Sequence, residues 1–353
     1  FANKIKLFFS EIFKNYWQNI AQIYYNLGLF AGLILFLQPK TVLKKCQEKQ
    51  LDYISITDHN TALAYEELEN INISSLFKGK IIPGIELNTK SLNVPIEILG
   101  YGIDYKKMNT LTKQFYLPAK ERNLVEFKRL YDKCIKYGIV LDKNCADNYD
   151  PNTFASRFFH KEITKHEENK KLLSSEAWDS SKIFYRQYMS NPNMPLYVEM
   201  DDLVPDFNTA SNLVKQAGGL VFIPHIFEYR ENSLPILNHI LENFKIDGIE
   251  CFYTTFTDEQ HKYIINICHE HNLFISGGSD FHGTCKPDVD IGIGYGNLKI
   301  PDEIIQPWLN KVTIFDKKNW LKLKYMNKPD FAMQSLVLFI CNHFSFKTYN
   351  RYY

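Results

Sequence analysis

The segment ISGGSDFHG (residues 275–283) is the part of the sequence from which the fold is inferred. An apolar run leads into two glycines, and an acid and an imidazole follow two positions apart. Residues i and i+2 of an extended chain point the same way, so Asp280 and His282 are predicted to project together from a strand end. A carboxylate beside an imidazole suits a Zn, Mn or Fe ion, and glycines let such ligands approach closely. A glycine-rich turn with two solvated side chains is the alternative interpretation.

Three other polar residues occupy the same kind of position. His59, Glu86 and His225 each lie just past a predicted strand, and helical patterns separate these strands. This alternation predicts an α/β fold built on parallel strands, whose active sites form at the C-terminal edge of the strands. Each residue alone has a structural explanation, as a turn residue, a surface acid or a core histidine. Together with Asp280 and His282 they favour one shared metal site.

Length and composition set the class of protein. The chain has 353 residues, is 45% hydrophobic and carries a net charge of +1, which suits one large domain with an insertion, or two domains. The near-zero charge argues against bulk electrostatic binding of nucleic acid and is compatible with a local basic site for phosphate. The 7 cysteines show no CxxC spacing and indicate reduced thiols, so a cytoplasmic location is expected.

Changes in the strand–helix rhythm predict five parts of the chain. They are an N-terminal helix (1–22), a first barrel part (23–105), an inserted helical cap (106–200), a second barrel part (201–316) and a C-terminal tail (317–353). Residues 23–37 are almost wholly apolar but fall short of the roughly 20 residues that span a bilayer as a helix. A buried strand is the preferred interpretation of this run, and a membrane anchor is the alternative.

Six segments of the chain resemble, in the same order, the PHP family, the "polymerase and histidinol phosphatase" metallophosphoesterases. They are ITDHN (56–60), PGIEL (83–87), EILGYGID (97–104), AGGLVFIPH (217–225), DGIE (247–250) and GGSDFHG (277–283). The resemblance implies a distorted seven-stranded (β/α) barrel of the PHP type with an inserted helical cap. It also implies two or three divalent ions (Mn, Zn or Fe) and hydrolysis of phosphoesters such as nucleotides or short oligonucleotides, without a stable nucleic-acid complex.

Carried over by position, the resemblance implies roles for individual residues. The expected metal ligands are His59, Glu86, Glu97, His225, Asp280 and His282, with Glu97 at a place where many relatives have a histidine. The expected catalytic residues are Asp280, His225 and Asp58. In the cap, Arg157 and His160 resemble an Arg-x-x-His segment that lies over the substrate phosphate. An arginine on the exposed face of a cap helix is the alternative interpretation of Arg157.

The chain departs from the family pattern at its start. The family opens with a strand carrying Asp-x-His-x-His and a following Asp, whereas here no histidine precedes His59 and the equivalent place falls near residues 26–34. Either the chain is a degenerate member, or residues 1–38 do not represent the natural N-terminus. The first hypothesis is a metal-dependent phosphoesterase with impaired activity. The second is a non-catalytic protein that binds metal or a phosphorylated ligand, and the third is a protein anchored to a membrane by residues 23–37.

Overall fold

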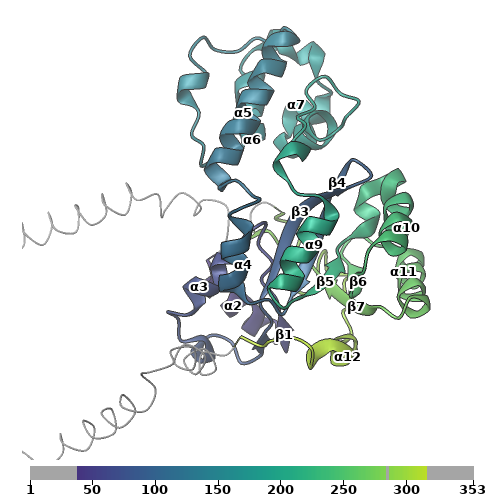
Figure 1. Cartoon of the computed structure of the whole chain (residues 1–353). Coiled ribbons are helices and arrows are strands. Elements are labelled where there is room, and N and C mark those ends of the chain that lie inside the picture. The colour runs from purple at the N-terminus through teal and green to yellow at the C-terminus, as the bar shows by residue number, and fades with distance from the viewer. Residues whose placement is uncertain (1–37, 284–285, 316–353) are drawn as a thin grey trace, which may run out of the picture.

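The computed structural model describes residues 38–283 and 286–315 (Figure 1). The predicted N-terminal helix, the apolar run at 23–37 and the tail at 317–353 lie outside these residues. Within them, no helix is both long enough and apolar enough to cross a membrane. Figure 1 shows a sheet surrounded by helices and, above it in that view, a separate group of helices that includes α5, α6 and α7.

The strands of the described residues form two sheets that meet at one point. The small sheet pairs β1 (Tyr53–Ile54) with β2 (Lys80–Ile81), and the larger sheet has the order β3 (Gly84–Ser91), β4 (Val94–Tyr101), β5 (Leu220–Ile223), β6 (Gly248–Tyr253) and β7 (Phe274–Gly278). A parallel bridge between His59 and Glu86 connects the chain beyond β1 to β3. The predicted α/β class is therefore confirmed, whereas closure into a seven-stranded barrel stays a prediction.

The expectation of purely parallel pairing is wrong for part of the larger sheet. β3, β4 and β5 are antiparallel neighbours, while β5, β6 and β7 are parallel. Leu92 and Asn93 have φ values of 51° and 58° and form a two-residue turn of the kind that suits the twist of a hairpin. Such a short connection leaves no room for a crossover helix, so the strands that it joins must run antiparallel.

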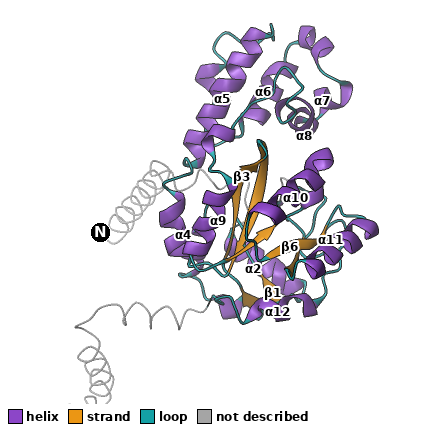
Figure 2. Cartoon of the chain, turned by 45° about the vertical axis from the view of Figure 1, so that its right-hand side comes forward, coloured by secondary structure: helices purple, strands orange, loops and turns teal. Residues whose placement is uncertain are grey.

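Helices cover both sides of the larger sheet. Around the sheets lie α2 (Pro39–Glu48), α3 (Leu63–Leu68), α4 (Tyr105–Thr112), α9 (Phe207–Gln216), α10 (Ser233–Asn243), α11 (Asp258–Glu270) and α12 (Gln306–Leu309). Short helical turns are η1 (Ile73–Ser75), η2 (Ala146–Asn148), η3 (Glu167–Leu172), η5 (Asp201–Leu203), η6 (Ile226–Asn232) and η8 (Asp302–Ile305). In Figure 2, α4 and α9 lie on one side of the sheet and α10 and α11 on the other. The apolar side chains between these layers form the main core.

A second group of helices has its own apolar core. It contains α5 (Ala119–Lys136), α6 (Ala155–Thr164), α7 (Ser175–Asp179), α8 (Ser181–Phe184) and the π-helical turn η4 (Tyr185–Met189). Leu130, Phe159 and Phe184 are fully buried inside it. By contrast, Tyr105 and Met108 of α4 belong to the main core. The second group therefore begins at α5 instead of residue 106, and we call residues 119–200 the helical unit.

Candidate metal centre

One buried tyrosine holds two strand ends together at the edge of the sheets. The Tyr65 hydroxyl donates to the carbonyl of Ile56 at 2.6 Å and accepts from the backbone N–H groups of Ile56 and Gly84 at 3.0 and 2.8 Å. Tyr65 is fully buried, so these bonds are shielded from water. They fix the chain beyond β1 against the start of β3, and His59 and Glu86 form a bridge directly after them.

Unusual backbone conformations mark the same edge. Asn60, His225 and Asp280 have φ values of 60°, 28° and 51°. A non-glycine residue in this region costs about 1–3 kcal/mol and persists where the surrounding structure enforces it, most often at functional sites. His225 follows β5 and Asp280 follows β7. Two of the predicted ligands, His225 and Asp280, are thus among the residues with strained backbone.

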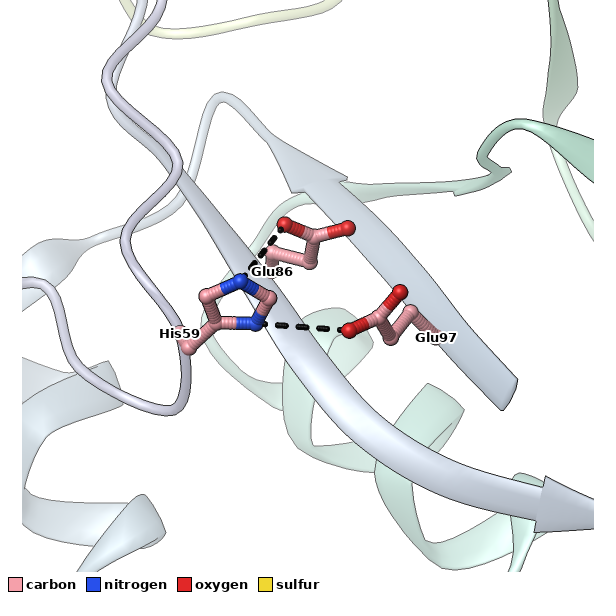
Figure 3. A group of neighbouring side chains, drawn as sticks. All are labelled: His59, Glu86 and Glu97. Atoms are coloured by element: carbon pink, nitrogen blue, oxygen red, sulfur yellow. Dashed lines mark ion pairs between the residues drawn. The ribbon is translucent and has the colours of Figure 1, made fainter. Parts of the chain in front are cut away.

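The inner part of the site consists of two carboxylates between the buried His225 and the exposed His59. His225 Nε2 lies 3.1 Å from Glu86 Oε1 and 3.3 Å from Glu97 Oε2. His59 places Nε2 at 3.5 Å from Glu86 Oε2 and Nδ1 at 3.5 Å from Glu97 Oε1 (Figure 3). One ligand atom from each of His59, Glu86 and Glu97 lies within 4.8 Å of the others. This spacing and these donor types suit a divalent metal ion.

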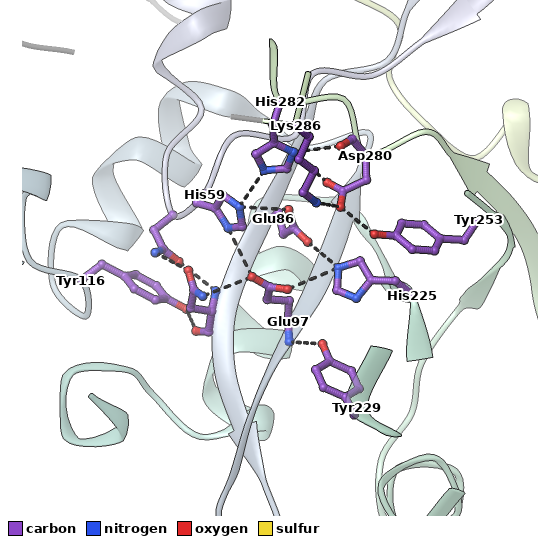
Figure 4. A network of polar contacts seen from close by, with 12 residues as sticks. His59, Glu86, Glu97, Tyr116, His225, Tyr229, Tyr253, Asp280, His282 and Lys286 are labelled. Atoms are coloured by element: carbon purple, nitrogen blue, oxygen red, sulfur yellow. Dashed lines mark hydrogen bonds and ion pairs between the residues drawn. The ribbon is translucent and has the colours of Figure 1, made fainter. Parts of the chain in front are cut away.

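The outer part of the site joins this cluster through His59. His282 Nε2 lies 3.4 Å from His59 Nε2, and two nitrogens on one tetrahedral ion with bonds of about 2.0–2.1 Å are roughly that far apart. Asp280 Oδ1 is 3.1 Å from His282 Nδ1, while its Oδ2 accepts from the Tyr253 hydroxyl at 2.8 Å and from the Lys286 ammonium. All six predicted ligands therefore meet in one network (Figure 4).

The pKa values of these groups follow from burial and pairing. Burial would raise the pKa of Glu97, but the hydrogen bond with His225 and the charge of His59 lower it to about 2. Burial would also lower the pKa of His225, yet its hydrogen bonds with Glu86 and Glu97 hold it well above the usual value. Two carboxylates thus converge on one imidazole nitrogen at 3.1 and 3.3 Å, and a donor set of this kind fits a divalent metal.

The pKa values of Asp280 and His282 in the outer part also depend on burial and pairing. Burial would raise the pKa of Asp280, but the hydrogen bond with His282 and the charge of Lys286 hold it well below its usual range. Burial would lower the pKa of His282, and the pairing with Asp280 raises it. The ion pair with Lys286 means that an ammonium group already neutralises part of the charge on this carboxylate.

Sequence reasoning missed several residues of this network. Glu250 on β6 is only 4% exposed, accepts the His225 backbone N–H at 2.9 Å, and has a pKa raised to about 8 by burial. The Tyr229 hydroxyl accepts the backbone N–H of Glu97 at 2.9 Å. The segment DGIE could have drawn attention to Glu250, because it is an acid within an apolar strand. Tyr229 and Lys286 carry no such local signal.

Asp58 takes part through its backbone. Its carbonyl oxygen accepts the N–H of Glu86 at 3.2 Å, which adds to the pairing between the chain beyond β1 and β3. Burial raises the pKa of the Asp58 carboxyl, and the neighbouring His59 lowers it. The catalytic role expected for Asp58 stays a prediction.

The two residues expected to bind phosphate lie in α6 of the helical unit. Arg157 is exposed, and its guanidinium lies 5.8 Å from the centre of the Phe154 ring. His160 Nε2 is 3.0 Å from the carbonyl oxygens of Ala177 and Trp178, so this nitrogen already serves the packing of the helical unit. The phosphate-binding roles of Arg157 and His160 stay predictions.

Comparisons with known proteins give two curated relatives and no matching family profile. A 5′-3′ exoribonuclease of Haemophilus influenzae is 25% identical over 280 residues, which cover 77% of this chain and 93% of that protein. The 5′-3′ exoribonuclease Rnm of Escherichia coli is 22% identical over 263 residues, covering 72% and 83% of the two chains.

Solved structures share the fold. A candidate metal-dependent phosphoesterase of Bifidobacterium adolescentis has a TM-score of 0.56 and 16% identity over 79% of this chain and 92% of its own. An amidohydrolase of Chromobacterium violaceum, solved with bound sulfate, has a TM-score of 0.57 and 19% identity over 80% and 94%. The resemblance of this chain to PHP-type metal-dependent phosphoesterases is therefore confirmed.

Proposed function

We propose that this protein is a metal-dependent phosphoesterase that acts on nucleotide-like substrates, with the 5′ end of a short RNA as the favoured one. The convergence of six predicted ligands in one network is the observation that carries the proposal. The names of the two exoribonuclease relatives support the substrate class. The scattered cysteines support a cytoplasmic location.

Each side chain of the network has a distinct task in this proposal. Glu86 and Glu97 would hold a divalent ion together with His59 and His225 in the inner part, and Asp280 and His282 would complete its surroundings in the outer part. A bound divalent ion supplies an acidified water and polarises the phosphoryl oxygens. Glu250 positions the backbone of His225 through the bond at 2.9 Å.

We also propose that the activity of this chain is impaired. The missing Asp-x-His-x-His would normally add ligands for a neighbouring ion, and two-metal sites stabilise both the attacking and the leaving oxygen. Losing one side of that arrangement should cost several kcal/mol, which lowers the rate by about a hundredfold or much more, at 1.4 kcal/mol per tenfold. Without any residual activity the protein would be the non-catalytic alternative, which binds metal or a phosphorylated ligand.

The test measures metal and hydrolysis together. The purified chain is loaded with Mn²⁺ or Zn²⁺, and its release of nucleotides from a 5′-phosphorylated short RNA is followed by chromatography. We expect slow, metal-dependent release from the 5′ end. A second chain, in which a strand with Asp-x-His-x-His and a following Asp replaces residues 26–34, should bind more metal and turn over faster. Metal binding without hydrolysis in both chains would contradict the enzyme and favour the non-catalytic alternative.

A further inference from the structure

The backbone N–H of Glu97 lies at a place where the larger sheet has lost one of its strands. On one side, β4 pairs with β3 and places Glu97 opposite Asn88. On the other side, β5 pairs with β4 from Leu99 to Tyr101 and ends at Ile223, so it stops short of Glu97. A donor in this position needs another acceptor, because an unpaired backbone N–H that is shielded from water destabilises the fold.

The hydroxyl of Tyr229 is that acceptor. It accepts the N–H of Glu97 at 2.9 Å, although the two residues are 132 positions apart in the sequence (Figure 4). Tyr229 reaches this place because the chain turns directly after β5, where His225 has a φ of 28° and η6 begins. The ring centres of Tyr229 and His225 lie 6.0 Å apart. One side chain therefore contacts the backbone of one predicted ligand and lies beside the ring of another.

The exact position of Glu97 matters because its carboxylate lies between two imidazoles. Oε1 is 3.5 Å from Nδ1 of His59, and Oε2 is 3.3 Å from Nε2 of His225. A metal site tolerates deviations of only about 0.2 Å in its bond lengths. A shift in the backbone of Glu97 would therefore weaken an ion that is shared between this carboxylate and the two histidines.

We propose that Tyr229 is a positioning residue of the metal centre. Its hydroxyl takes the place of the missing strand partner of Glu97 and holds the carboxylate where it can bind an ion together with His59 and His225. The proposal rests on the proposed function, because it takes Glu97 to be a metal ligand. Tyr229 itself contacts neither the ion nor the substrate.

Metal affinity tests the role of the hydroxyl. Tyr229→Phe removes the hydroxyl and keeps the ring, which packs against the main core. The matched control is Tyr263→Phe, the same change at a tyrosine of α11 that is 41% exposed. Isothermal titration calorimetry with Mn²⁺ on the full chain should show binding about tenfold weaker in Tyr229→Phe and changed by less than about twofold in the control. Unchanged affinity in Tyr229→Phe would overturn the proposal.

A double-mutant cycle with Glu97→Gln separates positioning from a general effect on stability. If Tyr229 acts through Glu97, Tyr229→Phe should weaken Mn²⁺ binding by less than about twofold once the charge of Glu97 has been removed. A loss of the same size in both backgrounds would mean that the hydroxyl supports the fold as a whole. That result would overturn the proposal even if Tyr229→Phe alone binds Mn²⁺ weakly.

Hydrogen exchange in EDTA tests the backbone contact without metal. The amide of Glu97 should exchange faster in Tyr229→Phe than in wild type, because the variant lacks the acceptor of this N–H. An unchanged exchange rate at Glu97 would overturn the proposal. If wild type binds Mn²⁺ but hydrolyses no phosphoester, the enzyme assignment fails and the role of Tyr229 in metal binding is retained.

Discussion

Buried glutamates are held in two different ways in the two parts of this molecule. In the metal centre, Glu86 is paired with His225, 139 positions away in the sequence, at 3.1 Å. In the helical unit, Glu162 is paired with Lys165 of the adjoining turn at 2.6 Å, and Glu126 lies 3.9 Å from Arg122 on the same helix. Pairs three or four residues apart form whenever the helix forms. The pairs at the strand ends exist only if distant strands meet.

The difference shows which acids lie close together although their negative charges repel each other. Glu86 and Glu97 both lie within reach of His225, and two neighbouring carboxylates repel each other unless a positive charge lies between them. The hairpin of β3 and β4 brings the two carboxylates together, and the tertiary structure adds His225. In the helical unit the buried acids Glu126 and Glu162 instead have cations three or four positions away in the sequence. This contrast favours a functional role for the acids at the strand ends.

The largest effect is expected at Glu86, which contacts both His59 and His225. Glu86→Gln keeps the size of the side chain and removes its charge. Elemental analysis should show the loss of most bound metal, and hydrolysis should fall about a hundredfold or more. Glu242→Gln, at an exposed position of α10, is the control and should change neither. Unchanged metal content in the Glu86 variant would mean that Glu86 does not bind the metal. The contrast between the glutamates of the metal centre and those of the helical unit would then have no functional meaning.

A partial loss is expected in the outer part of the site. Asp280→Asn together with His282→Ala removes a charge and an imidazole but leaves the buried pairs of Glu86 and Glu97 in place. The double variant should bind less Mn²⁺ or Zn²⁺ than wild type and more than Glu86→Gln, because a carboxylate charge offsets the cation. Elemental analysis of the three proteins gives this order. Equal metal content in wild type and double variant would exclude Asp280 and His282 as ligands.

A smaller effect is expected from Arg157 in the helical unit. Its guanidinium has a planar fork that matches phosphate oxygens and cannot bind a cation, so Arg157→Lys should raise the KM for a phosphoester about severalfold. Bound metal should not change. Steady-state kinetics with a short RNA, combined with elemental analysis, separates the two effects. Unchanged kinetics would identify Arg157 as an exposed residue that packs on Phe154.

The smallest effect concerns stability and pH. Burial raises the pKa of Glu126 above its usual value of 4.5, and the charge of Arg122 only partly offsets this. The folded protein therefore holds this proton more tightly than the unfolded chain does. The resulting stabilisation is complete below about pH 4.5 and is lost as pH rises through the raised pKa.

Glu126→Gln should remove this dependence. Urea unfolding between about pH 4 and pH 8 should show that the stability of the variant declines less with rising pH than the stability of wild type. Equal slopes would mean that Glu126 binds its proton no more tightly in the folded protein than in the unfolded chain.

Much of the sheet could be predicted from local patterns. The strands predicted before His59, Glu86, His225 and Asp280 exist near residues 53, 80, 220 and 274, because short apolar runs that end at glycine or polar residues are local signals. The hairpin between β3 and β4 was missed because its turn is formed by Leu92 and Asn93 instead of a typical Asn-Gly pair. The start of the helical unit was placed too early because α4 packs through Tyr105 and Met108, a choice that local periodicity does not reveal.

The sequence by itself determined the types of ligand and the strand ends that carry them. Alternation, glycines and the spacing of Asp280 and His282 are properties of neighbouring residues. Only the tertiary structure decided which atoms meet: Glu250 with the backbone of His225, Lys286 with Asp280, and the helical unit with the end of the sheet. The physical reason is that hydrogen bonds and charge pairs depend on distances of about 3–4 Å. Strand order, register and helix packing set those distances between residues far apart in the sequence.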